Sequence, residues 1–470
     1  MRHVKFIIII AVCFFSISAM SAMLPLPTAV PQKSQKLSLQ DAIALALRTN
    51  SGVQISELQR ILDKFGLETV IHSYGVQWTA PTLTSQLQNG VPPQWSASTG
   101  IAVNAPSGTS VGITQSNNFS GGVGNTQLQV TQHLLRGFGF AVNRVNYQDA
   151  LDKESVAKLN FKNSVITTVV TVISNYRALV ASENSLKINR QTLASQEESV
   201  MNSKLRVDAG QLAPSELLQQ EATVENTRLG VVQQEDALRN SYQTFLSSLG
   251  MPADKKIIVD RHIALSHETI PSLQACIDTA LKNNIAYQQA LLTLQVTKRT
   301  LITAEDARKW QLDAQATTTV GSQLGQPINS IGSTAPTVLF TLSVPFDNIS
   351  LKQAVVSAKI AIEDAEINLR QQKEDLIRSV MNQYATIQNQ AQQIDIAKQS
   401  VQMQEKTVLD AKLKLKYGRV SVFEVDTLED QLLAQRLNLV TTEINYLNAV
   451  TALHQILGST LHNWHIHLRY

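Results

Sequence analysis

Two similar stretches of this chain decide its fold: SLQDAIALALRTN at Ser38–Asn50 and SLQACIDTALKNN at Ser272–Asn284. Seven of their thirteen paired positions are identical. Further along the chain, a glycine at Gly210 is matched by one at Gly418. The sequence therefore predicts two similar structural halves within its 470 residues, in place of the two or three unrelated domains that this length ordinarily suggests.

The two halves are expected to span residues 23–250 and 272–458, with a linker at 251–271 and a C-terminal tail at 459–470. Each half shows the same series of patterns in the same order. The expected elements are a first helix at about 38–74 and 272–310, a strand region at about 76–135 and 311–346, a long helix at about 143–209 and 351–417, and a shorter helix at about 214–249 and 421–457. At 1.5 Å per residue, each long helix extends over roughly 100 Å.

The first 22 residues have the composition of a secretory signal peptide. Arg2, His3 and Lys5 come before an apolar run that extends from Phe6 to about Ala19. After this segment no stretch reaches the ~20 apolar residues of a membrane-spanning helix, and Ser164–Val180 comes closest. Such a chain is expected to be a soluble periplasmic or secreted protein, or a β-barrel protein of an outer membrane.

Apolar residues recur at every seventh position in the long and the shorter helices. In the long helices these are Val172, Leu179, Leu186, Leu193, Val200 and Val207, then Val380, Ile387, Ile394, Val401, Val408 and Leu415. In the shorter helices they are Leu217, Val224, Val231, Leu238 and Phe245, then Val425, Leu432, Leu439, Tyr446 and Leu453. A seven-residue repeat predicts left-handed coiled-coil hairpins. The other positions are so polar that these helices are expected to form a rod or a wall wetted on both sides.

The strand regions alternate apolar and polar residues, as half-buried strands do. Alternation is clear at Gln311–Val320 and Thr337–Val344, and in the first half at Gln127–Thr131, whose partner strand is expected between residues 77 and 104. Residues 105–126 and 321–336 have the composition of loops. Each half is therefore expected to supply one hairpin, which makes four strands per chain.

Strands of about ten residues that are apolar on one face suit a bilayer-spanning barrel. Four strands cannot close a barrel, and unpaired strand edges are not tolerated in lipid. The chain must then oligomerise. Three chains that contribute twelve strands form the smallest barrel expected to leave an open lumen.

Composition argues against several other classes of protein. The net charge is +3 and the charges are scattered, so nucleic acid is not an expected partner. No nucleophile, base and orienting acid occur together, so no enzyme and no cofactor are predicted. In the tail, His462, His465 and His467 offer a metal site, but a loosely ordered tail is the preferred interpretation. A soluble periplasmic coiled-coil adaptor or scaffold remains the main alternative, since it also explains the heptads.

The order of these segments resembles that of TolC-like outer membrane efflux proteins. The resemblance rests on the doubled SLQ segments, on VTQHLLRGFGF at 130–140, and on the paired turns LRVDAGQLAPSELLQQEA at 205–222 and LKLKYGRVSVFEVDTLED at 413–430. It implies a homotrimer with one twelve-stranded outer membrane barrel on a long periplasmic helical tube. It also implies passive export of small molecules or proteins, together with a periplasmic adaptor (a membrane fusion protein) and an inner-membrane pump of the RND or ABC type.

The same resemblance implies an acidic entrance at the periplasmic end of the tube. Glu424 lies six residues after Gly418, where family members place an acid of the entrance. Three copies of Glu424 would form an anionic ring that favours cations. Asp426 and Glu216 are the other candidates for the entrance and its gating contacts. For Glu424 a capping box with Ser421 is an equally good explanation.

The turns between the long and the shorter helices are candidates for adaptor contact. Gly210 and Gly418 suit the left-handed backbone of a tight turn between helices. By resemblance, the tips that contain these glycines and Arg419 receive the adaptor.

Overall fold

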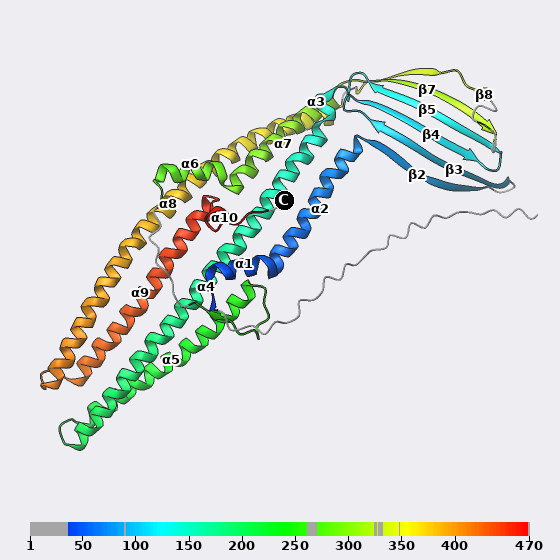
Figure 1. Cartoon of the computed structure of the whole chain (residues 1–470). Coiled ribbons are helices and arrows are strands. Elements are labelled where there is room, and N and C mark those ends of the chain that lie inside the picture. Colours follow the sequence, from blue (N-terminus) through cyan, green and yellow to red (C-terminus); the bar gives the residue numbers. More distant parts are fainter. Residues whose placement is uncertain are drawn as a thin grey trace, which may run out of the picture.

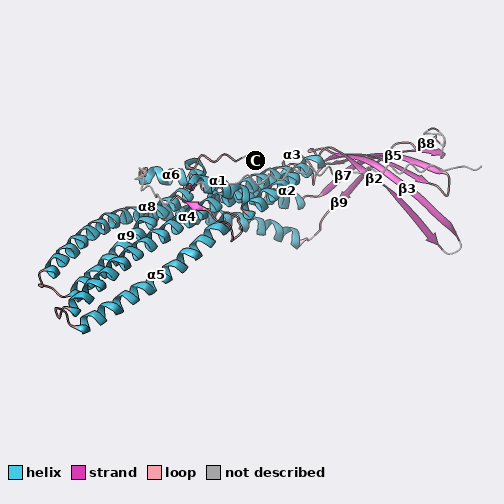
Figure 2. Cartoon of the chain, turned by 60° about the horizontal axis from the view of Figure 1, so that its bottom comes forward, coloured by secondary structure: helices cyan, strands magenta, loops and turns pink. Residues whose placement is uncertain are grey.

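The computed structural model describes residues 36–88, 91–260, 270–323, 327, 332–346 and 348–468. The chain forms an elongated wall of long helices that carries a curved β-sheet at one end (Figure 1). Two helical hairpins project in the same direction from the other end (Figure 2). The expected signal peptide at 1–22 lies outside the described residues.

Each half begins with two short helices that meet at an asparagine. These are α1 (Leu39–Thr49) and α2 (Ser51–Ser73) in the first half, and α6 (Leu273–Asn283) and α7 (Ile285–Ala307) in the second. The prediction of one continuous first helix is therefore wrong in both halves. Asn50 and Asn284 have extended backbones, and their side chains cap the second helix by accepting from Gly52 N at 2.9 Å and Tyr287 N at 3.1 Å. A local cap competes with helix continuation at these positions.

The same two asparagines also bind the C-terminus of the shorter hairpin helix in their half. Asn50 Nδ2 donates to the carbonyl of Ser248 at 2.9 Å, and Asn284 Nδ2 donates to the carbonyl of Ile456 at 3.0 Å. These carbonyls lie at helix C-termini, where the helix itself supplies no donor. The asparagines therefore satisfy two helix ends at once.

The helical hairpins agree closely with the sequence prediction. They consist of α4 (Val145–Asp208) with α5 (Pro214–Ser248), and of α8 (Ile349–Lys416) with α9 (Val422–Ile456). The helices of each hairpin pack along each other, and all 22 predicted heptad residues are buried or half-buried. The predicted coiled-coil pairing is confirmed. The short α3 (Phe140–Asn143) leads into α4.

The helices lie side by side in a wall one layer thick. Near the sheet the order is α2, α4, α7 and α8, and toward the tips it is α5, α4, α9 and α8 (Figure 1). The edges of this wall are thus α2 and α5 on one side and α8 on the other.

The main hydrophobic core surrounds the middle of α4. The helical segment Phe140–Asp208 is the only one among the described residues that is long and apolar enough, by length and composition, to cross a membrane. Its apolar residues lie instead in a core shared with α1 and α5, where Val165, Val172 and Leu179 are at most 1% exposed. Packing against other helices therefore explains the apolar run at Ser164–Val180.

One antiparallel sheet contains most of the strands. Its members are β2 (Val76–Gln88), β3 (Val91–Asn104), β4 (Thr109–Asn118), β5 (Val123–His133), β7 (Gln311–Gln323), β8 (Gly332–Ser333) and β9 (Thr337–Ser343). The order is β2-β3-β4-β5-β7, and both β8 and β9 pair with the far side of β7. Separately, β1 (Lys36–Leu37) pairs in parallel with β6 (Ile258–Val259), within the expected linker.

The prediction of one hairpin per half, and so of four strands per chain, is wrong for the first half. Residues 105–126, expected to be a loop, contain all of β4 and the start of β5. Val111 and Ile113 alternate with small and polar residues in β4, but the surrounding Gly, Ser and Asn hide this pattern. Hydrogen bonds to a strand on each side stabilise β4 whatever its intrinsic strand propensity.

In the second half, β7 and β9 confirm the two predicted strands. The segment 321–336 between them was expected to be a loop and is one only in part. The strand β7 continues to Gln323, and Gly332–Ser333 pairs back to it. Residues 324–326 and 328–331 of this segment lie outside the described part of the chain.

The C-terminal tail is docked, which corrects the expectation of a loosely ordered tail. It forms α10 (Thr460–Asn463), in which Thr460 and Leu461 are 1% and 6% exposed. Trp464 and Ile466 pack against the main core. Burial of these apolar side chains outweighs the entropy of a free chain end.

Candidate functional site

Both hairpin tips turn on a glycine with a left-handed backbone. The φ angles of Gly210 and Gly418 are +68° and +70°. At each tip the residue after the glycine donates back to the last helical turn, from Gln211 N to the Arg206 carbonyl at 2.7 Å in the first hairpin. This is a glycine C-cap of the Schellman type. No described atom lies within 4 Å of a Cβ built on either glycine, so both tips are open surfaces.

The acids expected at the entrance lie in the first turns of the helices that follow these glycines. The hydroxyl of Ser421 accepts from Glu424 N at 3.2 Å and caps α9, while the side chain of Glu424 is exposed. Glu216 is half-buried in the first turn of α5. Carboxylates at helix N-termini are favoured by the helix dipole. Arg419 is exposed at the tip itself.

The structure places Asp426 apart from Glu424, in the contact between the two hairpins. Asp426 is 7% exposed and accepts a hydrogen bond from Gln220 of α5. Burial, together with the nearby charges of Glu429 and Asp430, raises the pKa of Asp426 to about 6. This acid therefore changes its charge close to neutral pH.

Further polar contacts join the two hairpins one turn away. Gln196 Nε2 of α4 donates to Asp430 of α9 at 3.1 Å across this contact. Beside it, Glu429 forms an ion pair with Lys412 of α8 within the second hairpin. Burial raises the pKa of Asp430 as well. Among the described residues, the second oxygen of Glu429 and the amide oxygens of Gln196 and Gln220 are buried without a hydrogen-bond partner. Buried groups of this kind are costly, so the contact is less stable than its burial alone suggests.

Sequence reasoning missed Gln196, Gln220, Glu429, Asp430 and Lys412. A signal was present in the heptads. Three residues after an apolar heptad residue of α4, where a coiled coil usually has a second apolar residue, the chain has a polar one. These residues are Asn189, Gln196 and Ser203, and all three are buried.

A second link between the hairpins lies nearer the main core. The guanidinium of Arg177 on α4 donates to the Leu447 carbonyl at 2.8 Å, to Asn448 Oδ1 at 3.2 Å and to Thr451 Oγ1 at 2.7 Å, all on α9. This neutral set of acceptors has no part that titrates near neutral pH. The hairpins are thus joined through neutral acceptors at Arg177 and through acidic groups toward the tips.

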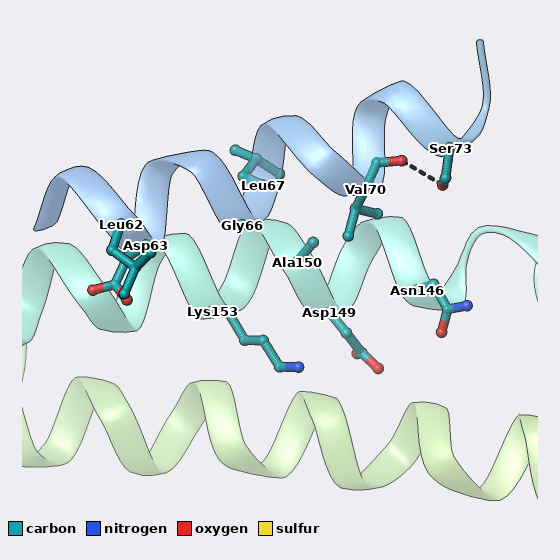
Figure 3. Close-up of a pocket in the computed structure, with 10 residues that line it drawn as sticks. All are labelled: Leu62, Asp63, Gly66, Leu67, Val70, Ser73, Asn146, Asp149, Ala150 and Lys153. Carbon is teal, nitrogen blue, oxygen red and sulfur yellow. Dashed lines mark hydrogen bonds between the residues drawn. The ribbon is translucent and has the colours of Figure 1, made fainter. Parts of the chain in front are cut away.

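The structure offers little support for a small-molecule site elsewhere. A groove of about 450 Å³ lies between α2 and α4 (Figure 3). Figure 3 shows Asp149 and Lys153 pointing away from α2, and Asp149 accepts from Arg299 of α7 at 2.6 Å. Within the described ranges, no three His, Cys, Asp or Glu side chains cluster as metal ligands do.

Comparison with known proteins identifies the class of this molecule. The family model of the outer membrane efflux protein matches residues 93–251 and 276–459. No curated relative matches the chain. Among solved structures, the chain is similar to the open state of the MtrE outer membrane channel of Neisseria gonorrhoeae, with 13% identity, coverage of 92% of this chain and 94% of that one, and a TM-score of 0.71.

Two further channels share the fold. The outer membrane protein VceC of Vibrio cholerae is 14% identical over 89% of this chain and 96% of its own, with a TM-score of 0.68. The CmeC outer membrane channel of Campylobacter jejuni is 13% identical over 90% and 86%, with a TM-score of 0.66. The matches include helical wall and strands together, so neither a soluble adaptor nor an enzyme is supported. This chain belongs to the outer membrane efflux protein family and is an export channel-tunnel of the outer membrane with a large periplasmic portion.

Proposed function

We propose that three copies of this chain close into one conduit, with a periplasmic helical tube and a shared outer membrane barrel. The support comes from the two edges of the single chain. One edge consists of β2, α2 and α5, and the other consists of β9 and α8. Among the described strands, β2 and β9 each pair on one side only. Lipid does not tolerate open strand edges, so another copy must pair with them.

The observation that carries this proposal is an apolar stripe on each helical edge. On α2, Ile55, Leu58, Leu62 and Phe65 follow one another at helical spacing, and each is more than 60% exposed. On α8, Val356, Ile360 and Ile367 form a second exposed stripe. Apolar surface of this extent marks a contact with a partner. The α2 stripe of one copy would be buried on the α8 stripe of the next.

The trimer is tested by placing charges on the α2 stripe. In the double variant Leu58→Glu, Phe65→Glu, each contact loses two buried apolar side chains worth ~1.5–3 kcal/mol each. We expect at least a ~100-fold weaker association, measured by sedimentation in detergent. The control Glu57→Gln changes a charge on the same helix outside the stripe and should leave the trimer intact. A wild-type protein that sediments as a monomer would refute the proposal.

The two halves of each chain are proposed to be structural repeats that line the same tube. Their helices have equal lengths in pairs: α1 and α6 have 11 residues, α2 and α7 have 23, and α5 and α9 have 35. Three copies would then present six hairpin tips around the periplasmic entrance.

The entrance is proposed to carry Glu424 as an exposed anionic ring, with Glu216 on the neighbouring hairpin and Asp426 in the gating contact. The exposed tips at Gly210, Gly418 and Arg419 are proposed to meet a periplasmic adaptor, which links the conduit to an inner-membrane pump of the RND or ABC type. A wall rich in Gln, Ser and Asn suits the passage of small molecules and of proteins.

A further inference from the structure

The sheet of each chain has six strand positions side by side, which we call lines. The strands β8 and β9 share one line, because they pair one after the other with the same side of β7. The first half supplies four of these lines, β2 to β5. Relative to the second half, which has β7 and β8/β9, it contains the additional pair β3–β4. Figure 1 shows this pair in the middle of the curved sheet, between β2 and β5.

The turn between β3 and β4 is built into the junction of sheet and helices. It spans residues 105–108, and Gly139 N, at the start of α3, donates to the Ser107 carbonyl at 3.1 Å. Gly108 has a φ of +88°, and a Cβ at this position would collide with the Gly137 carbonyl. The chain therefore returns fully to the helical end before it runs outward again as β4. A surface loop beyond the sheet would not make these contacts.

The register shows that β3 and β4 have the same two faces as the other strands. One row of direct neighbours crosses all six lines and is apolar throughout: Val76, Val103, Val111, Val130, Ala316 and Val338. The adjacent row faces the other side and is polar or small: Gln77, Ala102, Gly112, Gln129, Thr317 and Thr337. Paired residues of antiparallel strands share a face. In this row the apolar residues therefore continue without interruption through β3 and β4.

Strand direction allows the edges of successive copies to join. The strand β2 follows α2 and starts at the helical end, whereas β9 precedes α8 and ends there. With an even number of lines, β9 of one copy can pair antiparallel with β2 of the next, as in outer membrane barrels.

We propose that the conduit exits the outer membrane through a barrel of eighteen strands, six from each copy, rather than twelve. This inference rests on the trimer proposed above. Barrel diameter grows roughly linearly with strand number, and barrels of 16–18 strands hold an aqueous channel. The cross-section would be about twice that of a twelve-stranded barrel. An exit of this width suits cargo bulkier than a small solute, such as a polypeptide.

The test compares labelled cysteines on β4 with their direct partners on β5. Ile113 pairs with Leu128 on the apolar face, and Thr114 pairs with Gln127 on the opposite face. Each is changed to Cys, labelled with the fluorophore NBD, and reconstituted as the full-length protein in lipid vesicles. Of the two native cysteines, Cys13 lies in the expected signal peptide, which is absent from the mature protein. Cys276 is 1% exposed, and burial raises its pKa, so it resists labelling.

Doxyl-labelled lipid should quench the fluorescence of NBD at Ile113→Cys and Leu128→Cys. Aqueous iodide should quench the fluorescence at Thr114→Cys and Gln127→Cys. If the β5 pair behaves in this way while both β4 sites respond to iodide alone, the six-strand inference fails and the channel stands. If the β5 pair shows no contrast, the proposed membrane barrel fails, and this inference with it.

A measurement on the unmodified protein gives an independent answer. Electron microscopy of the wild type in lipid nanodiscs should resolve eighteen strands around the pore. Twelve strands in the membrane, with β3–β4 folded outside the barrel or into its lumen, would overturn the inference.

Discussion

Gly250 and Gly458 are two positions at which one added methyl group should damage the helical part of this fold. Each follows the C-terminus of a shorter hairpin helix, with φ of +70° and +67°. A Cβ on Gly458 would lie 2.5 Å from the Asn283 carbonyl, beside the asparagine break of its half. The matching Leu-Gly pairs in the two halves thus reflect a close approach of two backbones that only glycine permits.

Gly458→Ala should therefore destabilise the protein. The left-handed backbone alone costs ~1–2 kcal/mol for a residue with a Cβ, and the collision adds to this cost. The thermal unfolding temperature should fall. In the control Gly230→Ala, within α5, the nearest atom to the new Cβ is 3.8 Å away, and helix propensity predicts a gain of up to ~1 kcal/mol. An equal effect of the two variants would contradict this explanation.

Glu424 carries a residue-scale prediction about ion selectivity. Its backbone is capped by Ser421, which leaves the exposed carboxylate available to the entrance. If three copies form a ring, Glu424→Ala should lower the cation-to-anion permeability ratio by about twofold or more, measured as a reversal potential in a salt gradient across a planar bilayer. Glu68→Ala, on α2 far from the tips, is the matched control. Unchanged selectivity would refute the anionic ring and leave Glu424 only as an acid in the first turn of α9.

At the scale of elements, the two hairpins of one chain are joined differently along their length. Near the core, Arg177 of α4 binds three oxygen acceptors of α9. Toward the tips, the joining groups are acids and amides, several with unpaired buried oxygens. A tip contact of this composition can open at lower cost than the core, because its buried polar groups regain water when the hairpins separate.

Acidification should strengthen the tip contact. The pKa of Asp426 is raised from 3.8 to about 6 in the folded hairpins, so the folded state binds the proton more tightly than the unfolded state. Its contribution to stability is complete below pH ~4 and is lost as the pH rises through about 6. Asp430, whose pKa is also raised, acts in the same direction. The other charged groups near Asp426 are Glu429 and Lys412.

The measurement is protease protection of the hairpin tips at pH 5 and at pH 7.5. In the wild type, protection should be greater at pH 5. Asp426→Asn should give protection at pH 7.5 close to that of the wild type at pH 5 and reduce its dependence on pH. Glu424→Gln, which neutralises an exposed acid two residues away, should retain the wild-type dependence. A wild type protected equally at both pH values would refute this role of Asp426.

At the scale of the whole molecule, the open tips predict where a partner binds. With Arg419→Cys carrying a photoactivatable crosslinker, we expect a crosslink to a periplasmic adaptor in intact cells, because this residue is exposed beside a turn with open space around it. Glu68→Cys, exposed on α2 nearer the sheet, should give no such product. Equal crosslinking at the two sites would place adaptor contact outside the tips.

Much of this architecture is determined by sequence alone, since it depends on interactions that are local or periodic. The heptads identify the hairpins and their bounds, because every seventh residue meets the partner helix. Gly210 and Gly418 locate the turns, since few other residues adopt a left-handed backbone. The alternation in Gln311–Val320 and Thr337–Val344 is clean enough to identify β7 and β9.

Only the tertiary structure decided the features that depend on neighbours distant in sequence. The strand β4 exists because β3 and β5 satisfy its backbone on both sides, although its composition is that of a loop. The breaks at Asn50 and Asn284 form where carbonyls about 200 and 170 residues away accept their side chains. Asp426 is buried between the hairpins because α9 packs there against α5, a helix about 200 residues earlier in the chain. Hydrogen bonds and burial of this kind leave no periodic trace in the sequence, because their partners are set by how the elements pack.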